Sequence, residues 1–298
     1  MYINHNGMAT NVANTLTSHY GNLQTSTQRL SSGMRINSAA DDAAGLAISE
    51  LMRADVAALN QGVRNANDGI SLIQTADGAL GVIDEKLIRM KELAEQAATG
   101  TYDSTQRLMI ESEYQQMASE ITRIANATDF NGIKLLDGSL SALTQGGGKV
   151  HDGSELDARG ALKVHFGTSN DSAEDYYYIE IGNCTASALG VGNSAEGNGK
   201  TVSTQEAAQK ALVAINNAIV SKDKIRAHLG AIQNRLENTV SNLTIQSENL
   251  QSAESRIRDV DVATEMTNFV RNQVLTQSAV AMLSQANSMP QMALQLIG

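Results

Sequence analysis

Two adjacent carboxylates, Asp41 and Asp42, are the first residues whose types and spacing could do chemistry. They lie in a stretch with the composition of a loop, RLSSGMRINSAADDAAGLAISE (residues 29–50). A divalent-cation site would need further oxygen ligands at defined spacing, but two alanines and a glycine come next. We therefore interpret the pair as a cap and charge complement at the N-terminus of a long helix.

The run GNGKT (residues 197–201) resembles part of a phosphate-binding loop. The full pattern requires a glycine five residues before Gly199, and Ser194 stands there instead. No apolar strand directly precedes the run, as such a loop would require. The pattern therefore disfavours nucleotide binding.

Histidine and cysteine also give no catalytic or metal-binding pattern. The five histidines are scattered, without an i,i+4 pair or an HExxH motif, and no nucleophile elbow is present. Cys184 is the only cysteine, which excludes an internal disulfide framework and a cysteine-built metal site. We expect no enzyme activity, no cofactor and no metal.

The composition excludes further classes of protein. The 32 acidic residues outnumber the 22 basic residues, so the electrostatic footprint of a nucleic-acid-binding protein is absent. The chain has no secretory signal pattern and no apolar run near the roughly 20 residues that span a bilayer. These signals alone predict a soluble, cytoplasmic protein without membrane insertion, although specialised export pathways would escape this test.

The strongest structural signal is a seven-residue apolar repeat in three segments. The repeat consists of Leu16, Leu23 and Leu30, then Leu59, Ala66, Ile73, Leu80, Leu87 and Ala94, then Leu229, Leu236, Leu243, Leu250 and Ile257. Sustained heptads predict helices that pack along a shared seam. A single helix over residues 42–98 would be roughly 85 Å long.

The remaining segments complete the predicted fold. Helical spacing continues over residues 104–126 and 262–289, where Pro290 should limit the last helix. Asn131-Gly132 predicts a short hairpin, the segments LKVHFG and YYYIEIG read as strands, and STQE (residues 203–206) is a capping box. The predicted fold is mainly α: an elongated, antiparallel coiled-coil-like rod of paired N- and C-terminal helices, with a short β-hairpin and a small β-rich central insertion.

The terminal arms carry only a thin apolar stripe. Its N-terminal residues are Val12, Leu16, Leu23 and Leu30, set among Asn, Thr, Ser and Gln. Heptads can form the core of one chain or mate between chains, and such thin arms favour the second. We predict that the arms are disordered in the monomer and fold on assembly.

Five motifs together resemble bacterial flagellin. They are LSSGMRINSAADDAAGLAISE, NANDGISLIQTADGAL, ATDFNGIKLLDG, RIRDVDVATEM and SQANSMPQMALQLI, in the family's order. The resemblance implies an N-terminal inner-tube arm and connector (residues 1–43), N-terminal rod helices with a hairpin (44–139), a variable, solvent-facing insertion (140–201), a C-terminal rod helix (202–257) and a C-terminal inner-tube helix (258–298).

What the resemblance implies is a secreted, extracellular subunit of the flagellar filament that polymerises with itself. Its partners would include a flagellar export chaperone and the filament cap and hook-junction proteins. The self-assembly residues would be Val12, Leu16, Leu23, Leu30, Met266, Val270, Val274 and Leu283. The connector residues would be Gly33, Arg35, Ile36, Asn37, Asp41 and Asp42, with Arg35 and Ile36 contacting a neighbouring subunit.

The resemblance also implies recognition by innate immunity. The positions that match a Toll-like receptor epitope are Arg89, Leu93, Gln96 and Glu113, and the first three are spaced so that one helical face can present them. As an alternative to a role in receptor recognition, Arg89 and Glu113 would form a solvated ion pair. A cytosolic immune sensor would read Leu294, Leu296 and Ile297.

Three other interpretations stay open from the sequence. A hook–filament junction protein shares flagellin-like ends. A secreted enzyme carried on such arms would need more room than about 60 residues and a motif that is absent here. A helical adhesin or effector could use the same export route.

Overall fold

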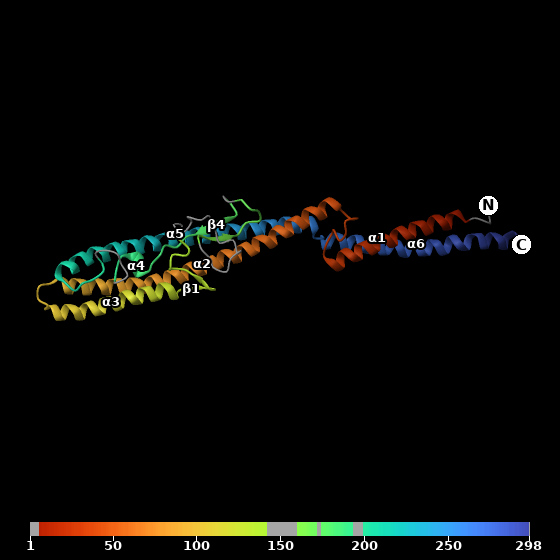
Figure 1. The fold of residues 1–298 in the computed structure, drawn as a ribbon. Coiled ribbons are helices and arrows are strands. Elements are labelled where there is room, and N and C mark those ends of the chain that lie inside the picture. The colour runs from red at the N-terminus through yellow and green to blue at the C-terminus, as the bar shows by residue number, and fades with distance from the viewer. Residues whose placement is uncertain (1–5, 142–159, 172–173, 193–198, 298) are drawn as a thin grey trace. The chain divides into compact units, whose positions relative to one another are not determined.

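The computed structural model describes residues 6–141, 160–171, 174–192 and 199–297 (Figure 1). The helices in these residues are α1 (Gly7–Ser32), α2 (Ala43–Ala98), α3 (Ser104–Ala127), α4 (Ala186–Leu189), α5 (Gln205–Arg258) and α6 (Val262–Ile297). The strands are β1 (Asp129–Phe130), β2 (Ile133–Lys134), β3 (Leu162–His165) and β4 (Tyr176–Ile179). This arrangement confirms the predicted mainly α fold with two small antiparallel hairpins.

The chain divides into two compact units. The terminal unit combines Met1–Val56 with Glu248–Gly298, and the central unit is Ala57–Ser247. The long helices α2 and α5 each contribute residues to both units, because the division falls inside them.

The central unit has a deep apolar core formed by α2, α3 and α5. The predicted heptad row on α2 is buried at every position: Leu59, Ala66, Ile73, Leu80, Leu87 and Ala94. A second buried row follows three residues behind the first: Gly62, Gly69, Ala76, Ile83, Met90 and Ala97. Together the two rows form the 3–4 spacing of a coiled-coil seam, so this helix is packed along its length in the unit.

Both predicted β features are confirmed. Asn131 and Gly132 have φ of 51° and 83°, the two left-handed residues that a tight hairpin turn between β1 and β2 requires. Strands β3 and β4 pair antiparallel, with Leu162 opposite Ile179 and His165 opposite Tyr176.

The described part of the insertion packs against α2. The side-chain amide of Asn65 donates to the carbonyl oxygen of His165 at 2.8 Å, and a Cβ added at Gly62 would overlap the carbonyl oxygen of Phe166. Val164, Ile179 and other residues of the insertion belong to the core. The expectation of a solvent-facing insertion is therefore wrong for these inner residues, because they cover the glycine-containing row of α2.

Two predicted helix ends are also corrected. Thr204, rather than Ser203, caps α5, since its hydroxyl accepts from the Ala207 N–H at 3.2 Å and its carbonyl from the Ala208 N–H at 2.9 Å. Pro290 lies inside α6, which continues to Ile297. A proline removes one N–H donor, and the residues beyond it can still form helical hydrogen bonds.

Candidate functional site

The paired terminal helices α1 and α6 form the candidate site. Three contacts fix their antiparallel register: the Asn6 side-chain amide donates to Ala286 O at 2.8 Å, Arg29 lies 3.9 Å from Glu265, and Met34 forms a β-bridge with Asp259. The predicted pairing of the N- and C-terminal helices is thus present within one chain (Figure 1).

On α1, the predicted stripe lies along this pairing. The four residues Val12, Leu16, Leu23 and Leu30 are all half-buried. Between them, at the complementary heptad positions, lie the half-buried His19 and the buried Ser26. The contact is therefore thin and partly polar, with little apolar area to offset the entropy of ordering a helix of 26 residues.

On α6, most of the predicted residues lie away from α1. Its most buried positions are Glu265, Thr276, Ala279 and Ala286, and Leu283 is half-buried on the same face. The packed row of α6 consists mostly of small and polar residues, and the other three predicted self-assembly residues lie outside it. Met266, Val270 and Val274 remain 45%, 48% and 55% exposed.

These exposed residues belong to a larger surface, which we name the outer face of α6. It consists of Val262, Met266, Val270, Val274, Leu275, Val280, Met282, Met289 and Met292, each at least 38% exposed. The only charged residues between positions 262 and 297 are Glu265 and Arg271. Exposed apolar residues gathered along a helix mark a surface that contacts another protein. The described chain provides a cover for one side only.

The polar groups in the α1 contact are only partly paired. Within the described part of the chain, two side-chain nitrogens, Nδ1 of His19 and Nε of Arg29, are buried without a hydrogen-bond partner. Buried polar groups normally have partners, so these two atoms mark a contact that one chain alone does not satisfy.

Hydrogen bonds within the terminal unit hold the connector that follows α1. Gly33 ends α1 with φ of 73°, and its carbonyl accepts from the Val260 N–H at 3.0 Å. The backbone N–H of Arg35 donates to Arg258 O at 2.6 Å, and its guanidinium donates to Ile257 O at 2.6 Å. Asn37 donates its side-chain amide to Met34 O at 3.0 Å.

One expectation for the connector is wrong. Ile36 is only 1% exposed, so its side chain is not available to a neighbouring subunit. The reason is local: Gly45 leaves space that the Ile36 side chain occupies, and a Cβ at Gly45 would lie 2.8 Å from Ile36 Cδ1.

The two acids have separate roles. Asp42 caps α2 as predicted, because its carboxylate accepts from the Gly45 N–H at 2.9 Å. Asp41 instead closes the preceding turn, accepting from the N–H groups of Ser38 at 3.0 Å and Asn37 at 3.2 Å. These bonds, with that of Ser38 the strongest, hold the pKa of the Asp41 carboxyl below its usual value.

The proposed immune-receptor positions do not share one surface. Arg89 is exposed and donates to Glu113 at 2.8 and 2.9 Å, which raises its guanidinium pKa. Gln96 is exposed and donates to the Tyr102 hydroxyl at 3.0 Å. Leu93 is 1% exposed, so the expectation that one helical face presents all three is wrong: Leu93 packs into the core. The side chains of Leu294, Leu296 and Ile297 lie outside the described residues.

Other candidate chemistry is absent from the described residues. Of the GNGKT run, Gly199 is described and its carbonyl accepts from the buried Tyr114 hydroxyl at 2.7 Å, so this backbone serves packing. Cys184 is fully buried, and burial raises the pKa of its thiol from 9.0 to about 12. The described chain has no cluster of metal-ligating side chains.

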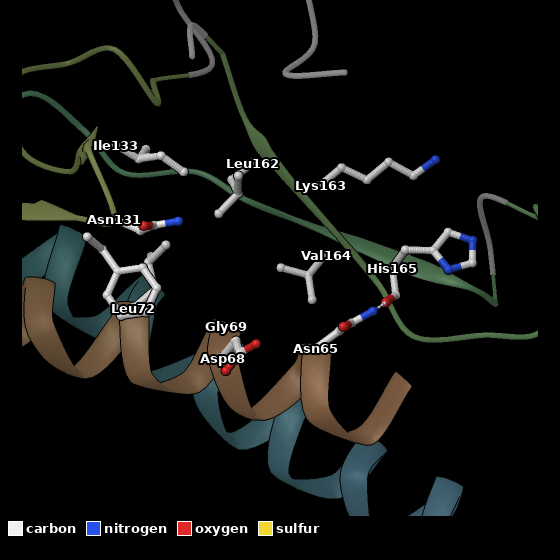
Figure 2. A pocket seen from close by; sticks show the side chains of 11 residues that line it. Asn65, Asp68, Gly69, Leu72, Asn131, Ile133, Leu162, Lys163, Val164 and His165 are labelled. Carbon is white, nitrogen blue, oxygen red and sulfur yellow. Dashed lines mark hydrogen bonds between the residues drawn. The ribbon is translucent and has the colours of Figure 1, made fainter. Parts of the chain in front are cut away.

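An open pocket of about 350 Å³ lies between α2 and β3 (Figure 2). Leu72, Leu162 and Val164 give it an apolar lining, and Asn65 is bound to the β3 backbone at its edge. These residues hold the insertion on α2. The titratable residues of the lining are Asp68, Lys163 and His165, and the Lys163 and His165 side chains are directed away from Asp68 (Figure 2).

The sequence did not predict the ionic group between α2 and α5, in which a lysine is buried. Lys222 is 1% exposed and lies 2.5 Å from Asp84 and 2.7 Å from Asp223, and Arg226 binds Asp77 at 2.7 Å. The signal was available, because Lys222 continues the buried α5 row of Ile215 and Ala218 at heptad spacing.

A helical scaffold with an uncovered apolar face is typical of proteins that bind other proteins. Comparison with known proteins identifies its family. The family model for the bacterial flagellin N-terminal helical region matches residues 3–141, and that for the C-terminal helical region matches residues 212–297. The chain therefore belongs to the bacterial flagellin family, whose members are structural filament proteins and not enzymes.

Two relatives align over their full length. Flagellin FlaB2 of Treponema pallidum is 40% identical over 297 residues, and the flagellin of Bacillus subtilis is 42% identical over 316 residues, each covering 100% of both chains. A solved structure of a putative flagellar hook-associated protein from Vibrio parahaemolyticus matches with a TM-score of 0.55 and 16% identity, covering 74% of this chain and 100% of that one. That likeness shows the fold alone.

No helix in the described residues has the length and apolar character that a membrane span requires.

Proposed function

We propose that this chain is the structural subunit of a bacterial flagellar filament that serves motility, and that it polymerises with copies of itself. The outer face of α6 carries this proposal, because one chain leaves it uncovered although it is apolar and nearly uncharged. The family and the full-length relatives support the same role. Because different surfaces must meet in neighbouring copies, the contacts do not close and a helical filament results.

Seeded growth tests this function. Monomer added to short filament fragments should elongate them into filaments visible by electron microscopy. A hook–filament junction protein would form no long filaments, and an adhesin or effector would not elongate seeds. Absence of growth under conditions that polymerise the Bacillus subtilis relative would reject the proposal.

The terminal helices are disordered in the monomer and become ordered on assembly. The half-buried stripe of α1 and the unpaired nitrogens of His19 and Arg29 support this, since neither makes a self-sufficient contact. Hydrogen exchange tests it: residues 6–30 should exchange fast in dilute monomer and slowly in filaments. Strong protection of this segment in dilute monomer would reject the proposal.

The subunit is secreted and lies outside the cell in the filament. We further propose that an export chaperone holds the C-terminal helix before secretion, and that the cap and hook-junction proteins contact the assembled arms. The uncovered residues of α6 supply an apolar surface that a chaperone would need to cover. Co-purification of the full chain with chaperone, lost on deletion of residues 262–298, is the expected result.

A second proposed role is recognition by the host Toll-like receptor for flagellin. Arg89, Glu113 and Gln96 are accessible, whereas Leu93 can contribute only through packing beneath them. Arg89→Ala should lower the signal of a receptor-reporter assay, and Arg123→Ala, which removes a comparable exposed ion pair with Glu120, is the matched control. Equal signals from both variants would reject this role. The cytosolic-sensor role of Leu294, Leu296 and Ile297 calls for the same assay with that sensor.

A further inference from the structure

Methionine is concentrated on the outer face of α6. Of the 11 methionines in the chain, four lie in this helix: Met266, Met282, Met289 and Met292. All four are exposed, by 45%, 57%, 41% and 49%. None of them lies in the row of α6 that packs on α1, so their thioethers are accessible in the single chain.

The other sulfur atoms differ in accessibility. Met90 and Cys184 are fully buried in the central unit, and the sulfur of Met34 is a partner of the Arg258 guanidinium at 3.1 Å. Outside α6, the strongly exposed methionines among the described residues are Met8 on α1 and Met109 on α3. An oxidant that meets the unassembled chain will therefore find most of its accessible sulfur on the surface that polymerisation uses.

We propose that these four methionines are an oxidation site that controls assembly, an inference that rests on the proposed polymerisation. The reactant is a peroxide such as hydrogen peroxide. The thioether sulfur attacks one peroxide oxygen, the O–O bond breaks, and an S–O bond forms; the sulfur is oxidised by two electrons and the other oxygen leaves as water. The product is a methionine sulfoxide, which a methionine sulfoxide reductase converts back to the thioether.

The sulfoxide affects the contact between subunits and not the contact of α6 with α1 of the same chain. Its oxygen is a strong acceptor on a side chain that was apolar, and covering it by a second subunit without a donor is unfavourable. The packed row of α6 contains no methionine, so the sulfoxides lie outside the contact that α6 makes with α1 when the two helices are ordered. In a finished filament the same sulfurs are covered, so oxidation stops subunit addition but spares filaments already built.

The test uses full-length monomer treated with hydrogen peroxide, with sulfoxide located by mass spectrometry. Seeded elongation by the treated protein should be at least about ten-fold slower than by untreated protein, and reductase treatment should restore it. The variant M266L/M282L/M289L/M292L should keep its elongation rate after treatment, whereas M109L should lose it as the wild type does. Elongation of the untreated protein tests polymerisation itself, so failure of that function is seen separately.

A second measurement does not depend on the variants. When partly oxidised wild-type monomer elongates seeds, sulfoxide at the four α6 positions should be depleted in the polymer relative to the free pool, and sulfoxide at Met109 should not. Filaments treated after assembly should resist oxidation at the same four positions. Treated monomer that elongates normally, equal sulfoxide in polymer and pool, or equal oxidation in filament and monomer would each overturn the proposal.

Discussion

The two units are built from the same helical repeat with different core material. In the central unit the heptad rows of α2 meet α3 and α5, and the core combines leucine, isoleucine and methionine with several alanines and a fully buried tyrosine. In the terminal unit α1 meets α6 through half-buried leucines on one side and Ala279, Ala286 and Thr276 on the other. The first unit is closed within one chain, and the second leaves its most apolar surface uncovered.

The difference shows that helical periodicity alone does not determine whether a helix pair is stable. The same 3–4 spacing in both units predicts pairing, but the free energy comes from the apolar area that the pairing removes from water. The central unit has that area within one chain, whereas the terminal unit has less of it. Four predictions test this comparison.

The largest difference is expected in proteolysis of the full-length monomer. A protease of broad specificity is required, because α1 has no arginine or lysine before Arg29. We expect cleavage within residues 6–30 and 272–292 at least about 100-fold faster than within the central unit, since locally unstable helices open often. Mass spectrometry of the early fragments measures this. Cleavage at similar rates in both units would remove the distinction between them.

Leucine truncations in each unit sharpen the comparison. Leu87→Ala, in the closed core, should cost about 4 kcal/mol of unfolding free energy, because it leaves a cavity that cannot collapse. Leu23→Ala, at the half-buried α1 contact, should cost under about 1 kcal/mol in the monomer. Urea denaturation followed by circular dichroism measures both. In seeded elongation the order should reverse: for each kcal/mol of unfolding free energy lost, Leu23→Ala should slow elongation more than Leu87→Ala does.

Alkaline pH should destabilise the central unit through Cys184. Burial raises its thiol pKa from 9.0 to about 12, so the folded state holds the proton more tightly than the unfolded chain. The stabilisation is complete below pH 9, falls by at most about 1.4 kcal/mol per pH unit above it, and is lost near pH 12. The unfolding free energy of Cys184→Ala should fall less steeply between pH 9 and 11 than that of the wild type. Parallel curves would contradict the assigned cause.

The smallest effect is expected for the exposed ion pair. Arg89→Ala removes the contacts with Glu113 and Glu92 at the surface of the central unit, where water and salt replace them. We expect a melting temperature unchanged within error, with Arg123→Ala as an equally silent control. A clear fall in the melting temperature would mean that surface ion pairs, and not the core alone, stabilise the central unit.

Much of the fold could be predicted because heptads, the Asn131-Gly132 turn and the flagellin-like motifs are local patterns. The row Leu59, Ala66, Ile73 was readable because its residues are apolar. Its partner row begins with Gly62 and Gly69, which carry no apolar side chain. Only the structure shows that the Phe166 backbone lies against Gly62 and that the Val164 and Ile179 side chains lie against Gly69.

The candidate site was harder to predict, since the sequence cannot show which side of an apolar helix its own chain covers. The sequence predicts Met266, Val270 and Val274 as self-assembly residues. Only the structure shows that the register set by Asn6 and Arg29 places small and polar residues of α6 against α1 and leaves these three exposed. Ile36 and Leu93 were wrongly expected to be accessible for a related reason. Gly45 leaves space that Ile36 fills, and neighbouring helices bury Leu93, whereas the spacing of residues along a helix does not show how deeply each is buried.

The lack of charge in the arms has a consequence for growth in different media. Residues 6–28 and 272–297 contain no carboxylate, ammonium or guanidinium side chain. Dissolved salt weakens attractions between charges over a distance of about 8 Å at physiological ionic strength. Contacts made by these segments offer dissolved ions nothing to screen. A filament held at its centre by such contacts would keep that part of its cohesion from fresh water to brine.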